Sequence, residues 1–318
     1  MVLSLFTIPK AFQGHFGYIQ RNAIQSWTRL HPDIEIILFG DDEGTAQVAQ
    51  DFGLRHEPDM ARNEFGTYRV DVVFSRAQAL ARREVVCYVN CDIILMGDFC
   101  RALHRLRSVH PEFLMVGRRT DVDILGPWPF DDPQAEERLR DLALRSGRTR
   151  GPDWIDYFAF SRGLYGSDIP PFGVGRTCWD DWLVWKVLDR RVPVVDVSSF
   201  VLAVHQNHDY SHHPQGRQGV WRGSEAACNA QLAGGWKQLR TIEDSTEVLR
   251  ENGLAPNRWR HWAAAKRYAR QAGRVLFYDG IQRGWFLFLD LTRPLRRKLG
   301  LRAENLRRSR GKVLPPLG

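Results

Sequence analysis

Residues 85–95 read VVCYVNCDIIL, and this stretch carries the strongest indication of the fold. Its five apolar residues, 85–89, predict a buried strand that runs directly into Asn90-Cys91-Asp92. A charged carboxylate inside such an apolar run is costly unless it is paired or binds a cation. Asp92 is therefore either a ligand for a hard divalent cation or a strand-terminal residue that caps the next turn, and both interpretations stay open at this point.

Strand-like and helix-like segments alternate over the first 200 or so residues. Short apolar runs predict buried strands, and apolar residues at helical spacing, such as Phe16, Ile19 and Ala23, predict amphipathic helices. This alternation predicts the α/β class, with a mostly parallel sheet covered by helices on both faces. The predicted strands are 2–8, 34–39, 85–89, 113–116, 157–160, 192–197 and 201–204, and the predicted helices are 16–30, 43–52, 68–82 and 178–188.

Polar and ionisable residues follow the predicted strands. In a parallel sheet, ligands bind beyond the carboxyl ends of the strands, so the residues at these ends are candidates for a binding cleft. The stretches found there are Pro9-Lys10, Asp41-Asp42, Asn90-Cys91-Asp92, Arg118-Arg119 and His205.

A glycine-containing loop, 170–177, leads into a predicted helix whose first turn carries Asp180 and Asp181. Acidic residues are favourable at a helix N-terminus, so helix capping is one interpretation of this pair. The flanking Trp179 and Trp182 suggest another, because flat indole rings pack well on the faces of sugar rings. Asp180 is the preferred functional acid, since it lies nearer the loop.

Four histidines occur within residues 205–213, directly after an apolar strand. This density suggests a site, with His205 as the first candidate and His208 as the second. A polar loop and a zinc site built from His205, His208 and Asp209 are the alternatives. Arg118-Arg119 has two interpretations as well: a clamp for phosphate oxygens, or a surface turn with scattered ion pairs.

Taken in order, these segments resemble a glycosyltransferase of the GT-A type over roughly residues 1–240. Such enzymes place an Asp-x-Asp motif directly after a hydrophobic strand, and Asn90-Cys91-Asp92 matches its position but has Asn in place of the first Asp. The resemblance implies that Asp92 and His205, with His208 second, bind Mn²⁺ or Mg²⁺ at the donor diphosphate. It also implies that Asn90 contacts ribose.

The resemblance extends to donor and acceptor residues. It implies that Asp180, before Asp181, is the general base for the acceptor hydroxyl of an inverting enzyme. A solvated helix charge is the alternative for Arg76. The donor-binding residues that the resemblance implies are Thr7, Pro9, Lys10, Asp41, Asp42, Arg76, Asn90, Arg118 and Arg119.

The predicted activity is transfer of a sugar from a UDP- or GDP-linked donor to a hydroxyl of a glycan, a lipid-linked or another acceptor. One alternative is a nucleotidyltransferase, although the glycine-rich basic loop expected after its first strand is replaced here by Pro9-Lys10. The other alternative is a non-catalytic protein that binds nucleotide sugars or glycans on the same fold.

Charge divides the chain unevenly. The 318 residues carry a net charge of +8, and from Pro256 onward there are 16 Lys and Arg against 3 Asp and Glu, or +13, which leaves 8 − 13 = −5 for the preceding residues. We predict a catalytic domain at 1–240, with a donor half at 1–125 and an acceptor and metal half at 126–240, and a helical basic extension at 241–318. The aromatic run 285–289 beside the basic residues of 293–298 suits an anionic membrane surface or a helix packed on the domain.

Several classes are disfavoured by the sequence. No secretory signal and no run of about 20 apolar residues is evident, so we expect a cytoplasmic protein. Peripheral contact of this protein with the inner face of the membrane is compatible with that location. Five cysteines without a Cys-x-x-Cys pair argue against a disulfide framework or a zinc ribbon. No recognition motif supports a nucleic-acid partner.

Overall fold

The computed structural model describes residues 3–209 and 216–269. The chain divides into two compact units, Met1–Arg258 and Trp259–Gly318. Within the second unit, residues 260–269 form a helix, and the aromatic and basic run predicted at 285–298 lies outside the described residues. Among the residues that are described, no helix has both the length and the hydropathy required to cross a membrane.

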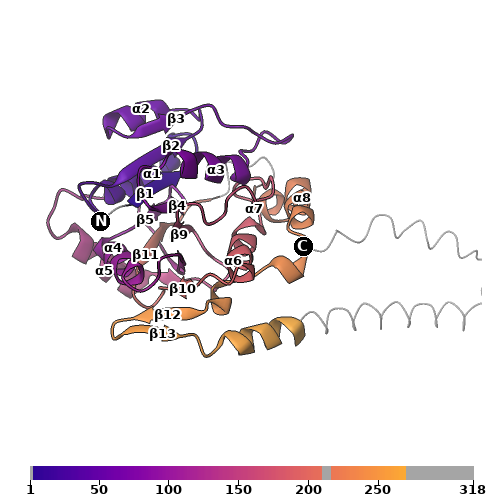
Figure 1. The fold of residues 1–318 in the computed structure, drawn as a ribbon. Coiled ribbons are helices and arrows are strands. Elements are labelled where there is room, and N and C mark those ends of the chain that lie inside the picture. The colour runs from indigo at the N-terminus through magenta and orange to yellow at the C-terminus, as the bar shows by residue number, and fades with distance from the viewer. Residues whose placement is uncertain (1–2, 210–215, 270–318) are drawn as a thin grey trace, which may run out of the picture. The chain divides into compact units, whose positions relative to one another are not determined.

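The main sheet of the first unit has nine strands (Figure 1). Most neighbours are parallel, but β9 runs antiparallel to both of its neighbours and β13 runs antiparallel to β12. The predicted α/β class with a mostly parallel sheet is therefore confirmed. In spatial order the strands are β3 (Arg55–Glu57), β2 (Glu35–Phe39), β1 (Leu3–Thr7), β4 (Val85–Val89), β9 (Tyr157–Ser161), β6 (Leu114–Val116), β10 (Val194–Asp196), β12 (Glu247–Arg250) and β13 (Gly253–Pro256).

A second, four-stranded sheet lies beyond the carboxyl end of β4. Its strands, in spatial order, are β5 (Ile93–Ile94), β11 (Ala203–Gln206), β7 (Arg119–Val122) and β8 (Arg148–Thr149). Strand β11 is antiparallel to β5, with His205 opposite Ile93, and parallel to β7, with His205 opposite Asp121. This register gathers polar side chains from three distant parts of the chain.

Helices cover both faces of the main sheet. Because side chains alternate along a strand, Leu5 of β1 packs in a core cluster with residues of α1, α2 and α4, whereas Phe6 packs in a cluster with residues of α3 and α6. The helices are α1 (Gly14–Thr28), α2 (Thr45–Asp51), α3 (Val70–Leu80), α4 (Gly97–Arg107), α5 (Ala135–Ser146), α6 (Trp179–Asp189), α7 (Gly216–Arg222) and α8 (Ser224–Leu232), with 3₁₀ turns η1 (Trp236–Gln238) and η2 (Ile242–Asp244).

The structure differs from the prediction in several segments. The sheet does not end before residue 240, because β12 pairs with β10, so the first compact unit continues to Arg258. Helix α4 and strand β5 were not predicted, whereas β11 of the small sheet corresponds to the strand predicted at 201–204. Strand β5 begins directly after the motif at 90–92, and α4 begins directly after the apolar run 93–96. That run shows no break between the two elements in the sequence.

Candidate functional site

A cavity of about 540 Å³ opens at the edge of the main sheet where β1 and β4 end. Its position follows the rule for parallel sheets, and ten of the predicted site residues line it. The ten are Pro9, Lys10, Asp42, Asn90, Asp92, Arg119, Asp180, Asp181, His205 and His208.

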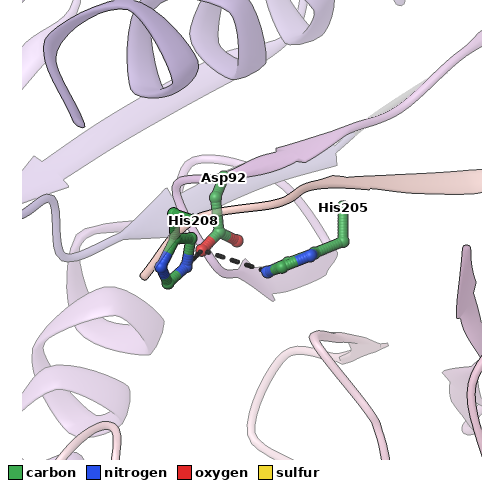
Figure 2. Close-up of side chains that lie close together, drawn as sticks. All are labelled: Asp92, His205 and His208. Carbon is green, nitrogen blue, oxygen red and sulfur yellow. Dashed lines mark hydrogen bonds and ion pairs between the residues drawn. The ribbon is translucent and has the colours of Figure 1, made fainter. Parts of the chain in front are cut away.

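Asp92, His205 and His208 meet in this cavity (Figure 2). Asp92 Oδ2 lies 3.0 Å from His208 Nε2 and 3.7 Å from His205 Nε2, and one ligand atom from each residue fits within a 4.8 Å cluster. The pairing of β5 with β11 explains the encounter, because Asp92 immediately precedes β5 and His205 lies on β11 opposite Ile93.

The Nδ1 atom of each imidazole, on the side away from Asp92, lies near an oxygen atom. His205 Nδ1 lies 3.2 Å from Asp121 Oδ1, and His208 Nδ1 lies 2.6 Å from the carbonyl oxygen of Asp209. The His208 contact favours the tautomer with its proton on Nδ1, which leaves the Nε2 lone pair for a metal ion, whereas His205 Nδ1 approaches Asp121 without hydrogen-bond geometry. Both Nε2 atoms point toward Asp92, as ligands of one shared cation would.

Asp92 has the properties of a metal ligand. Its Oδ1 is buried and has no hydrogen-bond partner among the described residues. Burial alone would raise the pKa of Asp92, but the neighbouring His205, His208 and Lys10 outweigh that effect and hold the pKa below its usual range. One carboxylate oxygen and two imidazole nitrogens suit Mn²⁺ or Zn²⁺ better than Mg²⁺, which prefers oxygen ligands alone.

Asn90 forms a chain of hydrogen bonds across the floor of the cavity. Its Nδ2 donates to Asp156 Oδ1 at 2.6 Å, and its Oδ1 accepts from the hydroxyl of Tyr88 at 2.9 Å. Its backbone N–H also donates to the carbonyl oxygen of Asp156. An amide, unlike a carboxylate, can donate to Asp156, which explains why Asn occupies the first position of the motif.

Lys10 is fixed through its backbone. Gln20 accepts from its N–H at 2.7 Å and donates to its carbonyl oxygen at 2.8 Å. The ammonium lies 4.6 Å from the centre of the Phe16 ring. Burial lowers the pKa of Lys10, and the nearby Asp92 opposes this shift. The loop therefore holds a cationic side chain beside the cluster of possible metal ligands.

Asp41 and Asp42 form a second polar group with two residues that the sequence did not point out. The hydroxyl of Tyr68 lies 2.7 Å from Asp41 Oδ1 and 2.7 Å from Asp42 Oδ2, and the Arg62 guanidinium stacks 3.7 Å from the Tyr68 ring centre. Gly40, with φ +95°, allows this arrangement, because a Cβ there would lie 2.6 Å from the Tyr68 hydroxyl. Asp42, Arg62 and Tyr68 line the cavity.

Arg119 is buried and paired on both sides. Its Nε lies 2.9 Å from Asp121 Oδ1, and its Nη1 lies 2.8 Å from Asp156 Oδ2. Asp121 also pairs with Arg150. The guanidinium of Arg119 is thus committed to protein carboxylates, so it organises the cavity wall more directly than it offers a phosphate clamp.

Four predicted donor residues are not among the cavity-lining residues of the described chain. Asp41 is next to the cavity through its contacts with Arg62 and Tyr68. Arg76 pairs with Glu57 on the surface, its side chain 54% exposed, as expected of a solvated helix charge. The four are Thr7, Asp41, Arg76 and Arg118.

Asp180 and Asp181 lie in the first turn of α6, as the sequence predicted. Burial raises the pKa of Asp180 to about 7, with backbone hydrogen bonds opposing the shift and the charges of Asp156 and Asp153 adding to it. A carboxyl that titrates near neutrality can accept a proton from a hydroxyl at physiological pH.

Of the two tryptophans predicted to shape a sugar subsite, Trp179 borders the cavity, and Trp182 is not among its lining residues in the described part of the chain. Trp179 and Trp182 are only 5% and 4% exposed and pack in the core between α6 and the sheet, because they belong to the apolar face of the helix. Trp154 and Trp221 also line the cavity, together with Tyr68.

Several other cavity residues were missed, and for those directly before β9 the reason is topological. Strand β9 runs antiparallel to its neighbours, so its beginning, not its end, meets the cavity. A search of strand ends therefore overlooks the segment 153–156 directly before β9. The principal missed residues are Arg62, Tyr68, Asp121, Arg150, Asp153, Trp154, Asp156, Arg176 and Trp221.

Comparisons with known proteins give matches among solved structures alone. No family model matches the chain, and no curated protein matches it. S. aureus TarS 1–349 in complex with UDP-GlcNAc is 12% identical with a TM-score of 0.43, over 65% of this chain and 60% of that one. Mycobacterium tuberculosis glucosyl-3-phosphoglycerate synthase in complex with Mg²⁺ and UDP is 16% identical with a TM-score of 0.41, over 65% of this chain and 72% of that one. The chain thus matches about 60% of the length of TarS 1–349, and the resemblance concerns part of the fold of each protein.

Proposed function

We propose that this protein is a glycosyltransferase that uses a nucleotide-sugar donor and a divalent cation. The observation that carries the proposal is the cluster of Asp92, His205 and His208, with one buried carboxylate oxygen that has no hydrogen-bond partner among the described residues. The cluster shares a single cavity with the cationic Lys10 and with Asp180. A cation site, a fixed ammonium and a base in one cavity are what departure of a nucleoside diphosphate requires.

Each residue has a distinct task in this proposal. Asp92, His205 and His208 would hold Mn²⁺, which neutralises charge on the leaving diphosphate when bound. Lys10 would add a second positive charge to the diphosphate. Asp180 would take the proton from the acceptor hydroxyl as that oxygen attacks the sugar carbon from the face opposite the diphosphate, which inverts the configuration.

The two halves of the first unit would divide the substrates. Residues 1–125 contribute Lys10, the Asp42–Tyr68 group and Asp92, and we assign the donor to this half. Residues 126–240 contribute Asp180 and the two histidine ligands, and we assign the acceptor to this half. The ligand cluster joins the halves, because Asp92 comes from the first and the histidines come from the second.

Nucleotide binding tests the metal role. UDP or GDP should raise the unfolding midpoint in the presence of Mn²⁺, and a chelator or Asp92→Asn should remove most of that rise. Asp123→Asn is a suitable control, since it alters an exposed carboxylate just after β7. Equal nucleotide affinity with and without a chelator would refute the metal role.

Turnover separates the two alternative functions. A glycosyltransferase should slowly hydrolyse a nucleotide sugar to nucleoside diphosphate and free sugar when no acceptor is present. A nucleotidyltransferase would instead release pyrophosphate from a nucleoside triphosphate and sugar phosphate. A binding protein would do neither while still giving the thermal shift.

We also propose that the basic C-terminal part contacts an anionic membrane surface. Its support is the charge of +13 from Pro256 onward and the exposure of Trp259 and Trp262, 71% and 70%, in the described part of the second unit. Indole rings and basic side chains together favour the interface of an anionic bilayer.

A further inference from the structure

Two tryptophans form an aromatic wall on the acceptor side of the cavity. Trp154 lies just before β9, and Trp221 lies on α7. Their ring centres are 5.2 Å apart with an angle of 49° between the ring planes, and both line the cavity. Trp221 is 37% exposed.

The wall is held in place by charged residues that neutralise one another. The guanidinium carbons of Arg119 and Arg150 lie 4.5 and 5.0 Å from the centre of the Trp154 ring. Both arginines are paired with Asp121, and Arg119 is paired with Asp156 as well. Trp154 is therefore fixed by cation–π contacts, and the arginines bring no uncompensated positive charge to this side.

Among the described residues, the acceptor side of the cavity also carries carboxylates. Asp153 and Asp180 line the cavity there, and Arg176 is paired with Glu225 at 2.5 Å. A phosphorylated or carboxylated acceptor would meet the like charge of Asp153, and of Asp180 when that carboxyl has lost its proton, which costs binding free energy. An uncharged molecule rich in hydroxyl groups would instead find acceptors for its O–H donors.

We propose that the acceptor is an uncharged saccharide that packs one face of a pyranose ring on the wall of Trp221 and Trp154 and directs hydroxyls toward Asp153 and Asp180. This inference rests on the proposed glycosyltransferase function and names its acceptor class. The C–H groups of a pyranose face are apolar and match a flat indole ring, while the hydroxyls at the ring edge reach the carboxylates. A lipid chain would use the indoles but leave the carboxylates unmatched.

Saturation-transfer NMR on the full chain with UDP and Zn²⁺, which is diamagnetic and so does not broaden ligand signals as Mn²⁺ would, tests the proposal. The probes are methyl pyranosides of the common neutral hexoses and of N-acetylglucosamine, with glucose 6-phosphate as the charged comparison. We expect at least one neutral glycoside to bind, with transfer strongest at its ring C–H protons, and glucose 6-phosphate to bind more weakly. Trp221→Ala should weaken neutral glycoside binding by at least about tenfold, as is typical when an aromatic anchor is truncated.

Two controls keep the outcome clear. Trp259→Ala removes an exposed tryptophan from the second unit and should leave glycoside binding unchanged, and Trp221→Phe should retain much of it. Equal glycoside affinity in Trp221→Ala and the parent, tighter binding of glucose 6-phosphate, or no binding of any neutral glycoside would each overturn the proposal. The thermal shift with UDP and Mn²⁺ and the acceptor-free hydrolysis of nucleotide sugar do not involve the wall. Their loss in the parent would refute the proposed function, whereas their persistence without glycoside binding would refute only the acceptor assignment.

Discussion

The Asn90→Asp substitution would restore the Asp-x-Asp pattern, yet the structure predicts that it destabilises the protein. In the parent, Asn90 Nδ2 donates to Asp156 Oδ1 at 2.6 Å. Two ionised carboxylates cannot remain at that distance, so the variant should fold only by taking up one proton from solvent, which the introduced carboxylate and Asp156 then share. The shared proton replaces the hydrogen bond that the amide made.

The cost follows from the pH. An aspartate carboxyl in the unfolded chain has a pKa of about 3.9, so keeping it protonated at pH 7 costs up to about 4 kcal/mol of the free energy of unfolding. Because the folded-state pKa of the carboxyl pair in the variant is raised above the unfolded value, the loss is small near pH 4 and grows by about 1.4 kcal/mol per pH unit as the pH rises. The difference between pH 5 and pH 7 should therefore be roughly 2.7 kcal/mol.

Urea unfolding of the parent and the variant at pH 5 and pH 7 measures this difference directly. Asn207→Asp is a matched control, because Asn207 Nδ2 donates to Asp123 Oδ1 at 2.7 Å in an exposed setting where solvent screens the like charges. The reasoning is refuted if Asn90→Asp costs the same free energy at both pH values, or if it loses no more than Asn207→Asp at pH 7.

Three further predictions follow from the site. Asp121→Asn should weaken Mn²⁺ binding by roughly 10- to 100-fold, because Asp121 orients His205, whereas Asp123→Asn should leave Mn²⁺ binding unchanged. Electron paramagnetic resonance measures the Mn²⁺ affinity of both variants, and equal affinities would contradict the orienting role of Asp121. The parent's transfer rate should rise with pH through about 7 as Asp180 loses its proton. The Asp180→Asn variant should transfer sugar about 100- to 10,000-fold more slowly and without that rise, while its nucleotide affinity stays unchanged. A variant that transfers sugar at the parent's rate would exclude Asp180 as the base. Removal of residues 259–318 should abolish cosedimentation with anionic liposomes at low salt, and a full chain that ignores such liposomes would rule out the membrane contact.

Much of the sheet could be predicted from local pattern. The strand at 85–89 was predicted with its observed bounds, because all five of its residues are apolar and both of its faces are covered. The ends of other elements shifted by one or two residues, as for the strand predicted at 201–204 and found at Ala203–Gln206. Hydrophobic periodicity marks the middle of an element, whereas its ends depend on pairing with distant strands.

The site was harder to predict because it depends on long-range pairing. Asp92, His205 and His208 could be named as a group from their positions after strands, and the structure brings them together. Asp121 could not, because its role arises only when β7 pairs with β11 and places it opposite His205. The aromatic lining was predicted only in part, because Trp179 borders the cavity but is just 5% exposed, and nothing in the sequence singles out Trp154 and Trp221.

The pairing of β5 with β11 means that a bound cation would act as a removable cross-link. It would join Asp92 to His205, two points separated by more than a third of the chain, and so close a long loop that contains α4, β7 and α5. Cross-links that close long loops restrict the unfolded ensemble most strongly, although the gain depends on how much strain the closed form carries. Amide hydrogens of β5 and β11 should therefore exchange more slowly with solvent when Mn²⁺ is present. The metal supply would then set how often the pairing of β5 with β11 opens.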